Sequence, residues 1–278
     1  MYRDPAFART RTLFTGHAAG AFTLPDELVD ARRRADALLD RLRDPGIAPK
    51  LPATRGRYLE ELHAAVDAGA ELPDPLVLRQ AAEHDRGLDE LRRILGDEAE
   101  HAQTVVVGIV QRLAVPVLAR HLRPALEETI DAARKAADAL GGRLPSPDAA
   151  VSASAPERKA YLELDGLAAR YRAIRDAQRI AADLTDGPRF DDRGLFGEFR
   201  NLPAVWTEWA NPRAAKPWPA GDRARLVWIV TSGVEPWLPT PADQDAAFAA
   251  TFPKAPILRG RSAGVPVDLE DLEELADA

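Results

Sequence analysis

The sequence predicts an all-α protein, a helical bundle or a set of elongated antiparallel helices. Apolar residues recur at alternating steps of three and four along several long stretches, which is the spacing of a helix buried on one side. Good helix-start signals precede several of these stretches. The chain has 278 residues, 46% of them apolar, and is therefore long enough to bury a substantial core.

The clearest stripe lies between residues 75 and 95. Gly96, Pro116 and Pro124 interrupt the pattern before it sustains a long coiled coil, so we expect one wall of a bundle packed on segment 105–115. Within the stripe, His84 is interpreted as a hydrogen-bonded polar residue of that wall. The stripe comprises Val77, Ala81, His84, Leu88, Leu91 and Leu95.

The chain before this stripe divides into three parts. Residues 1–22 have no regular pattern and are expected to form an irregular N-terminal arm. A helix is predicted to start after Thr23, with Pro25 in its first turn, and to end at residues 44–46. A Pro-rich connector precedes a shorter helix with one apolar side: Tyr58, Leu59, Leu62 and Val66.

The stripe is expected to end at a break or kink. Gly96 is a poor helix residue, and Asp97 with Glu100 has the spacing of a capping box for a new helix. The alternative is one continuous rod in which the glycine costs about 1 kcal/mol. Segment 98–115 is apolar on more than one face and is predicted to be the most buried helix. Further bends are expected at the two prolines that follow it.

A helical hairpin is predicted around linker 141–156. Gly141 and Gly142 end one helix, and Ser154 with Glu157 forms a capping box at the start of the next. The bundle is assigned to residues 23–184.

Residues 185–278 are expected to form a cap rich in tryptophan and proline. Short helices are predicted over 222–229 and 241–250, and an acidic C-terminal helix over 267–275. Tryptophan is enriched at binding hot spots, so some of these rings are candidate partner contacts. The alternative is a compact aromatic core in a region with few long helices. The candidate contact residues are Trp206, Trp209, Trp218 and Trp237.

Composition excludes several classes of function. The net charge of −7 argues against a dedicated nucleic-acid-binding protein, although local clusters such as residues 32–34 could contact an anion. Cysteine is absent, which rules out disulfides, zinc–thiolate sites and a cysteine nucleophile. The N-terminal residues do not resemble a secretory signal, and stretch 105–119 is too short to span a bilayer. We expect a cytoplasmic protein without membrane contact.

The sharpest chemical candidate is a pair of Glu-x-x-His spacings. Two such pairs hold metal ions in ferritin-like bundles, with a bridging glutamate from each of two further helices. Glu90 and Glu128 are nominated for that bridging role. The opposing interpretation is that glutamate precedes histidine by chance in glutamate-rich helices. The four candidate metal ligands are Glu60, His63, Glu98 and His101.

The expected function is non-enzymatic. No phosphate-binding loop, dinucleotide fingerprint or nucleophile elbow occurs in the sequence, and no catalytic residue or cofactor is assigned. We expect a helical interaction or assembly protein of the structural or scaffolding type, acting on a protein partner or on itself. The alternative is a di-metal helical enzyme built on the Glu-x-x-His pairs. A regulatory protein that contacts nucleic acid is the third hypothesis.

Overall fold

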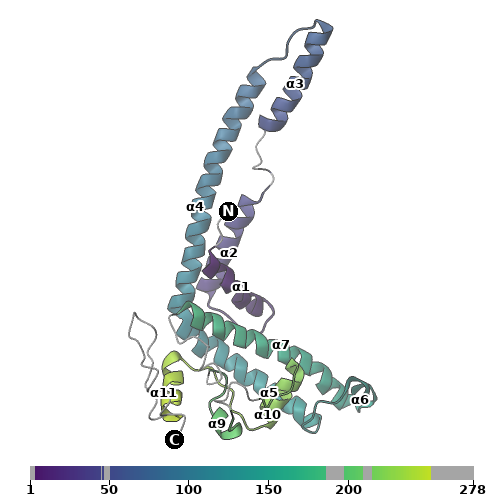
Figure 1. The fold of residues 1–278 in the computed structure, drawn as a ribbon, viewed down its shortest axis with the longest axis vertical. Helices are drawn as coiled ribbons and strands as arrows, with labels where there is room; N and C mark the ends of the chain where they lie inside the picture. Colours follow the sequence, from purple (N-terminus) through teal and green to yellow (C-terminus); the bar gives the residue numbers. More distant parts are fainter. Residues whose placement is uncertain (1–3, 45, 47–50, 186–196, 209–214, 252–278) are drawn as a thin grey trace, which may run out of the picture.

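A computed structural model describes residues 4–44, 46, 51–185, 197–208 and 215–251. Over these residues the protein is all-α, as predicted, and the only β feature is a bridge between Phe199 and Pro236. Helix α4 runs the length of one side (Figure 1). Its N-terminal half projects with α3 as a stalk, and its C-terminal half meets α1, α2 and a body formed by α5, α7 and α10.

The helices are, in chain order, α1 (Pro5–Ala18), α2 (Asp26–Leu42), α3 (Leu51–Ala68), α4 (Leu76–Val117), a π-helical segment η2 (Leu118–Leu122), α5 (Arg123–Ala139), α6 (Pro147–Ser152), α7 (Ala155–Leu184), α9 (Leu202–Val205), α10 (Asp222–Thr231) and α11 (Pro241–Thr251).

The expectation of an irregular arm over residues 1–22 is wrong, because α1 lies there. The Asp4 side chain caps this helix by accepting a 2.7 Å hydrogen bond from the Ala6 amide. Its buried residues follow one another at steps of three, and two of them are threonine and glycine. This narrow, partly polar stripe is not recognisable as an amphipathic helix from apolar spacing alone. The buried residues are Phe7, Thr10, Leu13 and Gly16.

The predicted break at Gly96 is also wrong, because α4 is continuous from Leu76 to Val117. An ion pair of 3.1 Å between Arg93 and Asp97 spans the glycine on the helix surface. Just beyond it, Ala99 and Ala102 are buried where α2 packs along α4. This packing offsets the roughly 1 kcal/mol that a glycine costs in a helix interior.

The bend predicted at the prolines is confirmed. Pro116 lies in the last turn of α4, the π-helical turn η2 follows, and Pro124 lies in the first turn of α5. A proline and a π-bulge are two ordinary causes of helix kinks. Figure 1 shows α5 leaving this point in a different direction from α4.

The helical run Leu76–Ala139 contains an 18-residue window with a mean hydropathy of 1.6, which is long and apolar enough to cross a membrane by length and composition. Half of that window is buried inside the structure. The central helix of a water-soluble bundle meets the same criterion, so the expectation of no membrane contact stays a prediction.

The segment predicted to form a helical hairpin contains α5 and α7, which pack against each other. Gly141 and Gly142 have φ angles of 66° and 76° and end α5, and the Gly142 amide donates to the Ala137 carbonyl at 2.9 Å. The capping box of Ser154 and Glu157 starts α7. The linker itself contains the short helix α6.

The cap also begins as expected. Helix α10 matches the prediction over 222–229, and α11 matches the prediction over 241–250. Thr240 and Asp243 bond each other reciprocally at the start of α11, with N–O distances of 2.9 and 3.2 Å. The predicted acidic helix over 267–275 lies outside the described residues.

Candidate interaction surface

The stalk consists of α3 and residues 76–97 of α4. Its two helices are antiparallel: the Leu51 amide donates to Asp85 Oδ2 at 2.7 Å, and the Tyr58 hydroxyl donates to the Pro73 carbonyl at 3.2 Å. None of the residues of α3 is fully buried. A helix that buries so little surface gains little stability from tertiary packing against the rest of the protein.

Helix α4 carries two heptad series that run side by side. The inner series faces α3 and α2, and all of its members are half-buried or buried. It contains Leu78, Ala81, Asp85, Leu88, Arg92, Leu95, Ala99, Ala102, Val106, Ile109 and Leu113.

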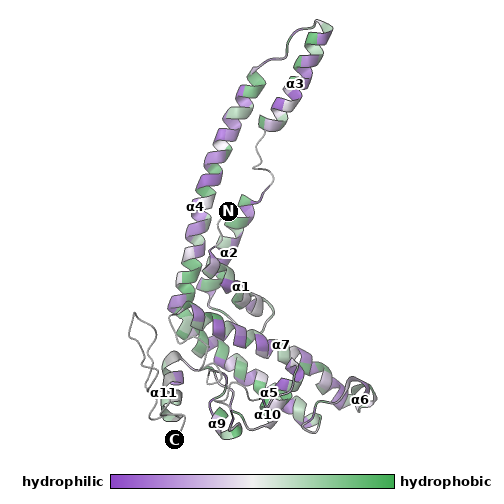
Figure 2. Ribbon diagram, in the orientation of Figure 1, coloured by the Kyte–Doolittle hydropathy of each residue, from purple (hydrophilic) through white to green (hydrophobic). Residues whose placement is uncertain are grey.

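The second series, the outer stripe, is exposed at every position. The exposed fractions of Val77, Leu91 and Ile94 are 43%, 41% and 46%. Figure 2 shows apolar residues recurring between polar ones along both stalk helices. The outer stripe contains Val77, Gln80, His84, Gly87, Leu91, Ile94, Glu98, His101 and Val105.

The stripe predicted from sequence therefore mixes two faces of α4. Ala81, Leu88 and Leu95 belong to the inner series, but Val77, His84 and Leu91 belong to the outer stripe. The two series are displaced by one residue along the helix, and both contain apolar side chains. A list of apolar residues spaced three and four apart can therefore combine members of both series. His84 is consequently exposed rather than part of a buried wall.

Charged rows border the outer stripe. Glu83, Glu90 and Asp97 are seven residues apart and, at 3.6 residues per turn, lie along the edge that faces away from the inner series. Arg93 pairs with both Glu90 and Asp97, at 2.7 and 3.1 Å, and this guanidinium lowers the pKa of Glu90 below its ordinary value. Arg79 lies 3.9 Å from Glu83.

The stalk is acidic as a whole. Residues 51–97, which comprise the stalk and the loop between its two helices, contain ten acidic and six basic side chains, a net charge of −4 out of −7 for the complete chain. A surface with this balance favours partners of positive charge.

The structure does not bring the two Glu-x-x-His pairs together. Glu60 and His63 lie on α3, whereas Glu98 and His101 lie on α4, and all four are exposed. The contact between Leu51 and Asp85 places Glu60 level with the start of α4, about 30 Å along the helix from Glu98. Within the described part of the chain, no group of three or more histidine, aspartate or glutamate side chains could hold a metal ion.

The two glutamates nominated as bridging ligands are engaged elsewhere. Glu90 is exposed and paired with Arg93 on the surface of the stalk. Glu128 lies on α5 and accepts a 2.6 Å hydrogen bond from Arg170 of α7, which lowers its pKa.

The described tryptophans of the cap contact one another and neighbouring side chains. Trp218 lies 5.7 Å from Trp206 and 5.5 Å from Trp228 between ring centroids, and Phe199 packs against both Trp218 and Trp228 at 6.1 Å. The guanidinium of Arg200 stacks 4.8 Å from the Trp237 ring. Trp209 lies outside the described residues. These contacts fit the aromatic core that the sequence left as an alternative to partner binding.

Sequence reasoning missed the buried arginine that joins the cap to α7. Arg175 is only 5% exposed and donates to the Trp237 carbonyl at 2.6 Å, the Glu198 carbonyl at 3.0 Å and Gln178 Oε1 at 2.9 Å. Its planar fork satisfies several acceptors from two cap segments at once. No rule of apolar spacing indicates a buried arginine at this position of α7.

A carboxylate lies next to this arginine. Glu198 accepts hydrogen bonds from Arg225 at 2.7 and 2.8 Å and from the Tyr171 hydroxyl at 2.9 Å. Burial raises the pKa of the Tyr171 hydroxyl, which therefore stays protonated and donates. The cluster holds α7, α10 and the segment around Glu198 together.

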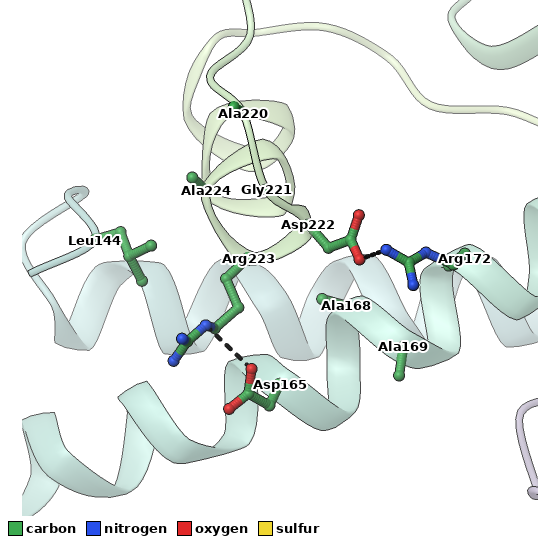
Figure 3. A pocket seen from close by; sticks show the side chains of 10 residues that line it. All are labelled: Leu144, Asp165, Ala168, Ala169, Arg172, Ala220, Gly221, Asp222, Arg223 and Ala224. Carbon is green, nitrogen blue, oxygen red and sulfur yellow. Dashed lines mark ion pairs between the residues drawn. The ribbon is translucent and has the colours of Figure 1, made fainter. Parts of the chain in front are cut away.

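One open pocket of about 410 Å³ lies between α7 and the start of α10 (Figure 3). Ala168, Ala169 and Gly221 contribute small residues to its lining. The charged side chains at its rim pair across the two helices, Asp165 with Arg223 at 3.0 Å and Arg172 with Asp222. Since these pairs already neutralise one another, the pocket offers a ligand little net charge.

Comparison with protein-family models, with curated proteins and with solved structures finds no significant match. The fold and its surfaces are therefore the basis for a functional proposal. Over the residues that the structure describes, they define an all-α protein with a polar and aromatic cap and an exposed two-helix stalk.

Proposed function

We propose that this protein is a non-enzymatic helical interaction protein that binds a protein partner, or assembles with itself, through the stalk. The observation that supports the proposal is the outer stripe, a heptad series exposed over its whole length on a projecting helix. Apolar residues in this spacing gain stability when another helix covers them. The weakly buried α3 fits the same use, because added contacts would stabilise it.

The test uses the full chain with Leu91→Glu and Ile94→Glu combined. Both side chains are partly exposed, so the protein is expected to fold, which circular dichroism verifies. The matched control is Val151→Glu with Leu162→Glu, which places two charges on exposed apolar positions of α6 and α7, outside the stalk.

Tagged protein is purified from its native cells, and the mass of its complexes is measured by light scattering after gel filtration. We expect complexes heavier than the monomer that the stalk variant loses and the control retains. Complexes that survive the stalk variant, or a monomer in every sample, would contradict the proposal.

A further inference from the structure

We infer that the outer stripe of α4 binds an amphipathic helix whose apolar side is flanked by lysine or arginine. The inference rests on the proposed function of the stalk and names the chemistry of its partner. Three features carry it: the length and spacing of the stripe, the open space beside its glycine, and the charge along its border.

The stripe has the dimensions of a helix-binding seam. Val77 to Val105 covers four heptads, about 42 Å of helix, at the alternating steps of three and four that match a second helix in a coiled coil. Four of its positions carry apolar side chains. The polar members Gln80, His84, Glu98 and His101 are of the kind that fix register rather than add affinity.

Gly87 gives a partner close access in the middle of the stripe. Apart from the adjoining residues and the backbone of α4 itself, no heavy atom lies within 4 Å of the position that a Cβ on this glycine would occupy. A partner side chain can therefore approach the α4 backbone between His84 and Leu91.

The charged border selects the partner. In a coiled coil, the residues that flank the apolar seam of one helix meet those that flank the seam of the other, and opposite charges set partner choice. Glu83, Glu90 and Asp97 form the free edge of the stripe. Arg93 pairs with Glu90 and Asp97, and Arg79 lies near Glu83, so these arginines offset part of the charge. With four negative charges in excess over residues 51–97, a helix with basic flanks is complementary.

A second copy of the chain fits less well. Antiparallel pairing of two outer stripes would bring the acidic row against its symmetry mate, which is repulsive. Parallel pairing would direct the acidic row toward the inner edge of the other α4, where α2 and α3 already lie. Both arrangements lack the charge complementarity of a basic helix.

The probe is a synthetic four-heptad peptide with leucine at the seam positions and lysine at the flanking positions. A second peptide carries glutamate at the flanking positions. Each is titrated calorimetrically into the full-length protein at about 0.05 M and about 0.5 M NaCl, because screening separates the charge contribution from the apolar one.

We expect the lysine peptide to bind at least about tenfold more tightly than the glutamate peptide at low salt, and the difference to shrink at high salt. Leu91→Glu with Ile94→Glu should weaken the binding of the lysine peptide at least about tenfold. Val151→Glu with Leu162→Glu, on exposed positions of α6 and α7 outside the stalk, is the control and should leave binding unchanged. Glu83→Lys with Asp97→Lys should reverse the order of the two peptides.

Failure of the lysine peptide to bind, equal binding of both peptides, or binding that ignores the outer-stripe variant overturns the inference. Complexes that still depend on Leu91 and Ile94 would then leave the proposed function standing. A dimer of the purified chain that Leu91→Glu with Ile94→Glu dissociates would assign the stripe to a second copy and overturn the basic partner.

Discussion

The Leu51 amide donates a 2.7 Å hydrogen bond to the Asp85 carboxylate and so fixes the register of α3 on α4. The first amides of a helix have no partner within it, and a carboxylate from another helix here takes the place of a local cap. The position of every α3 residue along α4, and thus the separation of Glu60 from Glu98, follows from this contact.

Asp85→Ala is expected to loosen α3 by about 0.5–2 kcal/mol, the usual cost of losing a cap. Hydrogen exchange measured by mass spectrometry should show faster exchange of α3 amides, with little change in the body. Asp89→Ala is the control, since Asp89 is exposed and forms a surface ion pair with Arg92, at 3.6 Å. Equal exchange of α3 in the wild type and Asp85→Ala would contradict the proposed register contact.

Arg175→Lys is expected to lower the free energy of unfolding by roughly 3 kcal/mol, because a lysine keeps the charge but leaves buried acceptors without a donor. Urea unfolding followed by tryptophan fluorescence measures this loss of stability in the cap, since all five tryptophans lie at or beyond residue 206. Arg179→Lys changes an exposed arginine of the same helix and should stay within about 0.5 kcal/mol. A similar result for both variants would show that Arg175 does not hold the cap.

Acid is expected to destabilise the region around His121. Burial, with the charges of Arg120 and His17, lowers the pKa of His121 from 6.5, so the folded protein binds fewer protons than the unfolded chain. The free energy of unfolding therefore falls as the pH drops through 6.5 toward the lowered pKa.

His121→Asn removes this titration while an amide can still bond Thr23, whose hydroxyl lies 2.8 Å from Nδ1. Thermal melts between about pH 7 and pH 5 should show a shallower loss of stability in this variant. An unchanged slope in His121→Asn would exclude this histidine as a source of acid lability.

Gly16→Ala is expected to destabilise the protein by about 1–3 kcal/mol, because the new Cβ would lie 2.7 Å from the buried Phe22 ring. Gly166→Ala in α7 should instead add about 0.5–1 kcal/mol, since its Cβ would meet open space. Thermal denaturation of both variants measures the difference. Stabilisation by Gly16→Ala would show that α1 can move away from Phe22.

The long helices could be predicted because their apolar spacing and end signals act locally. Ser154 with Glu157 and the paired glycines at 141 and 142 define α7 and the end of α5 whatever packs around them. Helix α1 and the continuity of α4 through Gly96 could not be predicted in this way. Both depend on tertiary packing against Phe22, α2 and the body.

The sequence predicted only part of the candidate surface. Val77, His84 and Leu91 were recognised as members of a stripe, but not as its exposed part, because burial depends on where α3 and α2 lie. The cluster of Arg175 and Glu198 joins residues 23 positions apart through backbone carbonyls, and no local pattern encodes such contacts.

The bend between Pro116 and Pro124 determines the direction of the long helix α4. Helix α4 extends 42 residues from it without interruption, about 63 Å, so each degree of rotation at the base carries the tip near Leu76 by about 1 Å. The direction in which α4 leaves this bend therefore sets where the tip of the stalk lies relative to the body.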